Sequence, residues 1–271
     1  MRPPDSAADL LRALQDRRPA AQRVALVCAH PDDETIGAGA SLSLLPGLLL
    51  VHVTDGAPRD LADARAAGFA TAAEYAAARR AELRAALDLG GTQAQTVDLG
   101  VPDQGASDAM AEVTRRLAEL FARHRIEACI THPYEGGHPD HDATAWATAR
   151  AARAAGVAVV EMLSYHAAPN GGMEADRFLP GPDPVRHPVR HVLTPAERAR
   201  KAAMFRAFAS QTHVLAPFPL GHEAFRPAPA YDFSAPPHPG ELHYERFDWG
   251  MTGARWRLLA ARAHEEAPCA A

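Results

Sequence analysis

The sequence is almost free of lysine. Lys201 is the single lysine among 271 residues, so arginine supplies nearly all of the positive side-chain charge. The formal net charge is −5 with all 14 histidines counted as neutral. A chain of this charge offers neither the basic surface that binds nucleic acid nor the polybasic patch that binds an anionic membrane, so we expect neither partner.

Cysteines and long apolar runs are scarce as well. The three cysteines, Cys28, Cys129 and Cys269, are too few for a disulfide framework, and the first two lie in apolar runs where a buried free thiol is usual. Residues 1–23 contain no hydrophobic signal core, and no apolar run reaches transmembrane length. We therefore expect a soluble protein of the reducing cytoplasm.

What the chain does contain is an alternation of apolar runs and helical periodicity. Hydrophobic residues make up 47% of the composition, enough for a substantial core. The pattern predicts strands at 24–29, 48–53, 96–99, 128–131 and 157–163 and helices at 6–17, 35–45, 79–89, 110–123, 143–155 and 195–208, with a lid-like segment before the third helix at 58–78. This alternation indicates an α/β fold with a Rossmann-like, mostly parallel sheet and helices on both faces.

The C-terminal third has a different composition. Residues 169–188 are rich in Gly and Pro and predict a loop, and residues 217–239 predict ordered coil wrapped on the body. We expect a single domain over 1–271, with a core at about 24–211 and a coil-rich C-terminal extension at 212–271. Its aromatic residues either pin the coil to the body, stack on a sugar or form a contact between copies of the chain, so homo-oligomerisation stays open.

Two clusters of histidine and aspartate carry the chemistry. The first apolar run stops at His30, Pro31 and three consecutive acids at 32–34. Ligands of an open α/β sheet bind at the carboxyl ends of its strands. Acids crowded against an apolar strand end are costly unless a cation neutralises them, and a divalent metal would do so. A second cluster of the same type, His-Pro-Asp-His, comes after the strand predicted at 128–131 and occupies 138–141.

The spacing of these clusters favours a catalytic metal. A catalytic zinc takes three protein ligands from histidine and carboxylate and keeps one position open. His30 and Asp33 are three residues apart at a strand-to-helix turn, so they can project the same way, and His141 can supply a third ligand. Asp32 is then free to accept a proton, and His138 faces the substrate. A single histidine is more often a surface or core residue, but two such clusters at two strand ends disfavour that interpretation.

The two clusters resemble the signature pair of the PIG-L/LmbE-like N-acetyl-sugar deacetylases. The residues that carry the resemblance are Ala-His-Pro-Asp-Asp-Glu at 29–34 and His-Pro-Asp-His at 138–141. Weaker features agree over about 24–211, and these are Thr54-Asp55-Gly56, Arg79 with Glu82, Leu89-Gly90, Pro102-Asp103, and Lys201 with Ser210-Gln211. The two clusters are specific, whereas the weaker features would mean little alone.

This resemblance implies a role for each residue. Zinc is bound by His30, Asp33 and His141, although two histidines and a carboxylate suit Fe²⁺ as well. The resemblance further implies that Asp32 is the general base, that His138 steadies the oxyanion, that Asp140 orients His138, and that Arg79 contacts sugar hydroxyls.

Two more substrate contacts are indicated less directly. Some family members carry a tyrosine two residues before the first histidine of the second cluster. Here Gly136 stands at that position, and the nearest aromatic residue, Tyr134, is our candidate in its place. Asp103 closes a predicted strand, so either a turn role or a substrate contact would explain it.

The implied reaction is hydrolysis of an N-acetylated amino sugar or its glycoconjugate, which gives a free amine and acetate. The alternative is an amidase that cleaves a larger thiol–sugar conjugate with the same metal site. A dinucleotide-binding enzyme is disfavoured because Gly37 and Gly39 are followed by Leu42 where a third glycine is needed. A non-catalytic binding module is disfavoured because the predicted base and ligands are all present.

Overall fold

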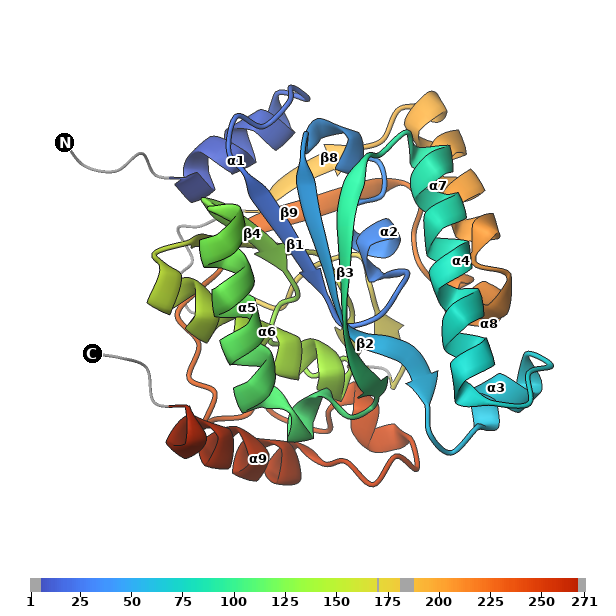
Figure 1. The fold of residues 1–271 in the computed structure, drawn as a ribbon, viewed down its shortest axis with the longest axis vertical. Helices are drawn as coiled ribbons and strands as arrows, with labels where there is room; N and C mark the ends of the chain where they lie inside the picture. Colours follow the sequence, from blue (N-terminus) through green and yellow to red (C-terminus); the bar gives the residue numbers. More distant parts are fainter. Residues whose placement is uncertain (1–5, 170, 181–187, 268–271) are drawn as a thin grey trace.

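The computed structural model describes residues 6–169, 171–180 and 188–267, so Cys269 and part of the predicted loop at 169–188 lie outside it. In the described part of the chain, a seven-stranded sheet runs through the molecule in the order β3-β2-β1-β4-β5-β9-β8 (Figure 1). Its strands are β1 (Val24–Cys28), β2 (Leu48–Pro58), β3 (Ala94–Asp103), β4 (Ala128–Thr131), β5 (Ala158–Met162), β8 (Val189–Val192) and β9 (His222–Pro227). A separate two-stranded sheet pairs β6 (His166–Ala167) with β7 (Met173–Glu174).

The sheet is parallel over its first five strands. β1 pairs in parallel with both β2 and β4, which places the change of strand order between β1 and β4. β9 then pairs antiparallel with β5 on one side and with β8 on the other. The expected Rossmann-like, mostly parallel sheet is confirmed, and the point where the strand order reverses is where such sheets bind ligands.

Helices cover both faces of the sheet, as predicted (Figure 1). The described α-helices are α1 (Ser6–Gln15), α2 (Asp33–Ala38), α3 (Ala62–Ala66), α4 (Ala72–Gly90), α5 (Met110–His124), α6 (Pro139–Ala155), α7 (Pro195–Ala207), α8 (Thr212–Leu215) and α9 (Gly253–Glu266). The core between the sheet and α5, α6 and α9 contains Ala25 and Val27 of β1. Val24 and Leu26 point to the opposite core, which α1, α4 and α7 cover. The side chains of a single strand therefore contribute to two hydrophobic layers, because successive side chains point to opposite faces of the sheet.

β2 and β3 extend further than the strands predicted at 48–53 and 96–99. β2 continues through Thr54, Asp55 and Gly56 to Pro58, beyond the predicted end of this strand at residue 53. The pairing of β2 with β3 shifts register twice in this region. Such irregularities bend a strand and re-aim its side chains, which explains why a turn-like sequence lies inside a strand.

The C-terminal segment contributes to the sheet itself. Residues 222–227, expected as coil, form β9, and Phe225 of this strand is fully buried in the core that α1 and α7 cover. The proline-rich flanks hide this strand from a pattern analysis, because proline weakens any strand prediction.

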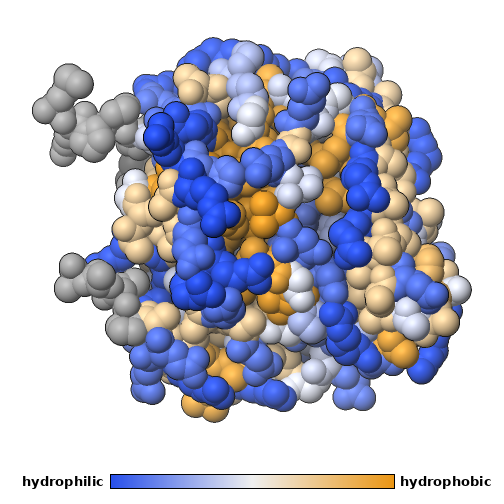
Figure 2. Space-filling model, viewed as in Figure 1, coloured by the Kyte–Doolittle hydropathy of each residue, from blue (hydrophilic) through white to orange (hydrophobic). Residues whose placement is uncertain are grey.

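The surface seen in Figure 2 carries hydrophobic residues in a strip between the flanking helices, with hydrophilic residues along its sides. The strip lies over the strands near β3, whose side chains are in part exposed at the sheet edge (Figures 1 and 2). Within the described ranges, none of the helices has the length and apolar content needed to cross a membrane.

A buried ion pair fixes the C-terminal end of α2. Lys201 of α7 is fully buried, and its Nζ donates to the Ile36 carbonyl at 2.7 Å and to Glu223 Oε1 at 2.8 Å. The Glu223 carboxylate also accepts from the backbone N–H groups of Ala40 and Ser41. A lysine at a helix C-terminus interacts favourably with its free carbonyls, so this pair ties α7 and β9 to the helix that comes after the first cluster.

Lys201→Met should therefore lower the free energy of unfolding by about 3–5 kcal/mol, because it leaves the Glu223 charge buried without its partner. Denaturant unfolding followed by circular dichroism measures this loss. The control is Arg198→Met, since Arg198 is exposed on the same helix and should change stability by less than about 0.5 kcal/mol. Equal stabilities of the two variants would contradict the role given to the pair.

A second buried network joins β5, β9 and the loop after β4. Arg226 Nε donates to Glu161 Oε2 at 2.7 Å, and Arg226 Nη2 donates to Glu135 Oε1 at 2.9 Å. Both glutamates are almost fully buried. Burial raises the pKa of Glu135 to about 8 and that of Glu161 to about 7, although Arg226 opposes both increases. The folded protein therefore binds protons here that the unfolded chain has already released at neutral pH.

Stability should accordingly fall as the pH rises from about 4.5, the unfolded pKa of Glu, to about 8. A carboxyl whose pKa is raised on folding contributes stability that is present below its unfolded pKa and is lost as the pH passes its folded pKa. Glu135→Gln keeps the acceptor toward Arg226 but cannot ionise, so its unfolding free energy should fall less steeply over this range. Chemical denaturation at four pH values tests this, and parallel slopes for both proteins would refute it.

Candidate functional site

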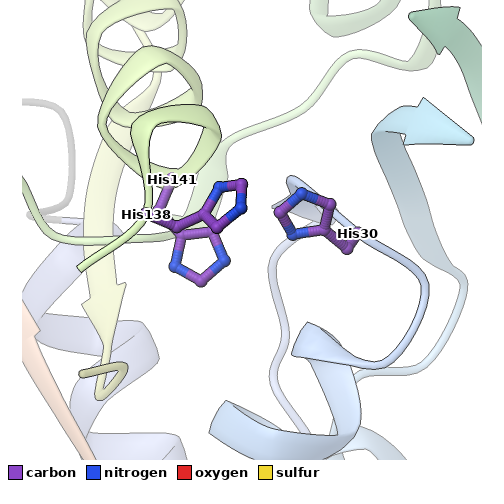
Figure 3. A group of neighbouring side chains, drawn as sticks. All are labelled: His30, His138 and His141. Carbon is purple, nitrogen blue, oxygen red and sulfur yellow. The ribbon is translucent and has the colours of Figure 1, made fainter. Parts of the chain in front are cut away.

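Both predicted clusters meet at the carboxyl end of the sheet, where the strand order reverses. His30 lies just after β1, and His138 and His141 lie at the start of α6, the helix after β4. Figure 3 shows the three imidazoles facing one another from these two elements. The ring centroids of His30 and His138 are 4.6 Å apart, and those of His30 and His141 are 5.3 Å apart. All three side chains are buried.

Asp33 lies between the histidines of the two clusters. Its Oδ1 is 3.2 Å from His141 Nε2, and its Oδ2 is 3.4 Å from His30 Nδ1. Oδ2 also accepts the backbone N–H of His30 at 2.7 Å, which fixes the turn between β1 and α2. The structure thus brings together the three residues predicted as metal ligands, although they come from two distant parts of the sequence.

His132 is a member of this cluster that the sequence analysis missed. It lies directly after β4, its Nε2 is 3.2 Å from Asp33 Oδ2, and its ring stacks on His141 at 3.9 Å. Nε2 also accepts the backbone N–H of Ala29 at 3.0 Å. Its position at the end of a buried strand, like that of the first cluster, was the signal that could have identified it.

His138 caps the N-terminus of α6. Its Nδ1 accepts the backbone N–H of Asp140 at 3.1 Å, so a neutral ring carries its proton on Nε2. Burial, reinforced by neighbouring His30, lowers the pKa of His138 to about 3. Both features favour a neutral imidazole at this position, and the expected role of His138 toward an oxyanion stays a prediction.

The Asp140 carboxylate orients His30 rather than His138. Its Oδ2 is 3.3 Å from His30 Nε2 and accepts the backbone N–H of Gln104 at 2.6 Å. Its Oδ1 accepts the N–H of Ala106. Only the backbone amide of Asp140, among the described hydrogen bonds, meets His138, so the expectation that its carboxylate orients His138 is corrected.

Carboxylates surround His30 on both sides. Asp103 Oδ1 lies 3.2 Å from His30 Nε2, beside Asp140, while Asp33 faces Nδ1. Burial alone would lower the pKa of His30, but these carboxylates, Asp103 foremost, raise it well above its usual value. A carboxylate behind an imidazole is the arrangement that orients metal-ligating histidines. Ser164 plays the equivalent part for His141, since its Oγ lies 3.1 Å from Nδ1.

Asp32 has a strained backbone. Its φ of 146° and ψ of −24° lie in a region that only glycine adopts easily. The peptide group before it is held on both sides, because Arg79 donates to the Pro31 carbonyl at 2.8 Å and Glu34 Oε2 accepts the Asp32 N–H at 3.1 Å. His52 Nε2 lies 3.0 Å from the same Glu34 oxygen and fixes it in turn. These contacts compensate the strain and fix where the Asp32 carboxylate points.

Arg79 holds Asp32 in place, and its expected contact with a sugar stays a prediction. The side chain is 3% exposed, and its guanidinium donates to Asp32 Oδ2 at 2.9 Å and to the Gly56 carbonyl at 2.9 Å, besides Pro31. Gly56 has a φ of 65°, and a Cβ there would lie 3.0 Å from the guanidinium carbon. The Thr-Asp-Gly segment of β2 thus makes room for Arg79, which positions Asp32.

A pocket of about 270 Å³ opens over this cluster. Asp103 and Arg79, both expected to contact the substrate, line it, and those contacts stay predictions. Tyr134 does not line it, which corrects the expected substrate contact. Its hydroxyl donates to the Ala235 carbonyl at 2.9 Å, and its ring packs on Trp256 in the core. The C-terminal segment reaches the pocket instead through other residues, which include Phe218, His243, Phe247 and Trp249.

The donor set fits a divalent transition metal. The donor atoms of His30, His138 and His141 lie within 4.8 Å of one another, as do those of Asp33, His132 and His141. His132 Nδ1 is buried and has no hydrogen-bond partner in the described structure. Imidazole nitrogens and carboxylate oxygens that converge in a buried site suit zinc or ferrous iron.

Comparisons with known proteins find a matching family model and solved structures with a similar fold. Residues 25–152 match the family model described as PIG-L, GlcNAc-PI de-N-acetylase. No curated protein sequence matches the chain. Among solved structures, the A40926 pseudoaglycone deacetylase Dbv21 is 22% identical, with a TM-score of 0.59 over 78% of this chain and 99% of that one.

Two further solved structures share the fold. The N,N'-diacetylchitobiose deacetylase of Pyrococcus horikoshii is 17% identical, with a TM-score of 0.51 over 78% of this chain and 80% of that one. GalB, the 4-carboxy-2-hydroxymuconate hydratase of Pseudomonas putida, is 18% identical, with a TM-score of 0.52 over 78% and 99%. Because a hydratase shares this fold with deacetylases, the reaction has to be argued from the site.

The strain at Asp32 predicts an unusual order of stabilities. Asp32→Gly should be more stable than Asp32→Ala by about 1–3 kcal/mol, because both remove the carboxylate but only glycine relieves the backbone. Denaturant unfolding of the two variants measures the difference. At exposed Asp60 the order should reverse, with glycine about 0.5–1 kcal/mol less stable than alanine. The same order at both positions would exclude strain at Asp32.

Proposed function

Because residues 25–152 form a PIG-L family domain, we propose that this protein is a metal-dependent hydrolase that removes the acetyl group from an N-acetylated amino sugar or its glycoconjugate. The products are a free amine and acetate. The observation that carries the proposal is the position of the buried Asp32 carboxyl beside His30, Asp33 and His141 in one pocket. The deacetylase neighbours, one named for a pseudoaglycone and one for diacetylchitobiose, support a sugar as the substrate.

His30, Asp33 and His141 would hold the metal, which we take to be zinc, with ferrous iron as the alternative. A metal bound there supplies a Lewis acid that polarises the amide carbonyl and lowers the pKa of water toward ~7. His138 is the competing third ligand by distance. Its Nδ1 accepts a helix N–H, however, and its Nε2 then carries the proton of the neutral ring, so Asp33 is the better ligand.

Asp32 would act as the general base. Burial raises the pKa of Asp32 to about 8, against the opposing effect of Arg79. The raised pKa makes the ionised Asp32 carboxylate a stronger base than an exposed one, so that form can take a proton from the attacking water. Asp32 then passes the proton to the nitrogen of the leaving amine as the C–N bond breaks, which balances the hydrolysis. General acid–base catalysis of this kind contributes on the order of 10²–10⁴ in rate.

His138 would stabilise the tetrahedral oxyanion through a neutral Nε2–H. The helix N–H that occupies Nδ1 keeps this donor pointed in one direction. Loss of one such donor typically costs about 3–4 kcal/mol in the transition state. Asp103 lines the same pocket and is proposed to bind sugar hydroxyls.

We further propose a partner and a cellular compartment for the enzyme. The substrate is a small molecule. The formal net charge of −5 does not favour nucleic acid or an anionic membrane as a binding partner. Cys28 and Cys129 are buried free thiols, which supports a reducing compartment, the cytoplasm.

Three substitutions test the assignment of roles. His141→Ala should lose most of the metal, whereas Asp32→Asn and His138→Ala should retain it and lose at least ~10²-fold in turnover. Elemental analysis gives the metal content, and release of amine and acetate from a panel of N-acetylated sugars gives turnover.

The control for this series is Asp60→Asn, an exposed residue outside the pocket, which should keep both metal and turnover. Near-full activity of metal-loaded Asp32→Asn would overturn the base assignment. Release of a larger acid from thiol–sugar amides, without release of acetate, would favour the amidase alternative.

A further inference from the structure

A set of apolar side chains, called here the apolar wall, lines the pocket and is partly exposed to solvent. It is formed by residues from α2, α8 and the C-terminal segment, and these are Ile36, Val214, Phe218, Phe247 and Trp249. Val214 is 55% exposed and Phe247 is 42% exposed. A folded protein seldom leaves large apolar side chains beside its reactive centre in contact with water unless a ligand covers them.

The aromatic part of this wall is continuous with the catalytic cluster. Phe247 stacks on Trp249, with ring centroids 4.5 Å apart and planes inclined by 15°. The Trp249 ring is in turn 4.8 Å from the ring of His138. A chain of ring contacts therefore runs from His138, at the site of the proposed reaction, through Trp249 to the partly exposed Phe247.

Acidic and polar side chains line the same pocket. Asp63, Asp103 and Gln104 line it together with Asp32. Such groups suit the hydroxyls of a sugar, whereas the apolar wall cannot satisfy them. A ligand that fits both sets of side chains has a polar part and an apolar part.

The pocket is large enough for only one of these two parts. Its volume of about 270 Å³ lies just below the roughly 300–1,000 Å³ of common ligand sites, so it holds a single sugar with little room to spare. A larger substituent has to leave through the mouth, where Val214 and Phe247 are exposed.

The wall is built before any ligand arrives. The His243 N–H donates to the Gly136 carbonyl at 2.9 Å, next to the second cluster. The Glu245 carboxylate accepts the backbone N–H groups of Leu242 and Gly253, both at 2.8 Å. These bonds hold the segment that carries Phe247, which reduces the entropy lost when a ligand binds to it.

We infer that the substrate carries an apolar aglycone, aryl or alkyl, and that Phe247, Trp249 and Val214 bind it. The inference rests on the proposed deacetylation, and it adds the chemical class of the group attached to the sugar. The acetyl group needs space for only one methyl, so the extended wall serves the aglycone.

The test compares methyl and phenyl glycosides of N-acetylglucosamine and N-acetylgalactosamine in both anomers. The wild-type enzyme should hydrolyse the preferred phenyl glycoside with a kcat/KM at least ~10-fold above that of its methyl counterpart, mostly through KM, which corresponds to about 1.4 kcal/mol. Phe247→Ala should reduce this ratio to ~2 or less. Leu258→Ala, a matched control on α9 at 73% exposure, should leave the ratio unchanged.

Binding and acyl-chain measurements separate the remaining outcomes. Calorimetry with phenyl and methyl glucosaminides and galactosaminides, which have no acetyl group, tests the wall without turnover. Equal kcat/KM for phenyl and methyl substrates overturns the inference and leaves the proposed function intact. No hydrolysis, together with tighter phenyl binding that Phe247→Ala removes, overturns the proposed function instead. A gain for N-hexanoyl over N-acetyl substrates that Phe247→Ala removes assigns the wall to the acyl chain and overturns the inference.

Discussion

The site depends on the balance of charge at the buried ends of β1 and β4. Carboxylates of both clusters gather there, and each would be costly to bury alone. Imidazoles and one guanidinium stand opposite them, so that Asp33 meets His132 and His141 while Asp32 meets Arg79. Backbone N–H groups satisfy further oxygens, as at Asp140. The groups that stabilise these buried carboxylates also make the cluster suitable for binding a divalent cation and for proton transfer.

Elements far away in sequence keep this balance in place. The Lys201–Glu223 pair, on α7 and β9, fixes the end of α2, which begins at Asp33. The C-terminal segment adds the aromatic wall of the pocket and rests on the loop before the second cluster through Gly136. The C-terminal segment at 212–271 is therefore part of the site, although its sequence predicted mainly coil.

Local patterns predicted the scaffold well where one periodicity dominated. The strand at 128–131 agrees with β4, and the predicted helix at 195–208 agrees with α7 and its Thr194 N-cap to within one residue. The pattern failed where tertiary pairing decided the outcome. β9 lies between proline-rich flanks and exists because β5 and β8 pair with it. The bend in β2 at 54–56 looks like a turn in sequence because it accommodates the Arg79 side chain.

The sequence by itself determined the parallel α/β sheet and the residue types of the two clusters, because an apolar run that ends in His-Pro-Asp indicates both a buried strand and a polar site at its carboxyl end. Only the tertiary structure determined which side chains form hydrogen bonds with one another. Arg79 reaches Asp32 across 47 positions, and His52 reaches Glu34 across 18, to hold a backbone conformation that no periodicity reveals. The reason is physical: hydrogen bonds at a buried, strained peptide are chosen by distance and direction in space, and these are set by the packing of the whole sheet rather than by spacing along the chain.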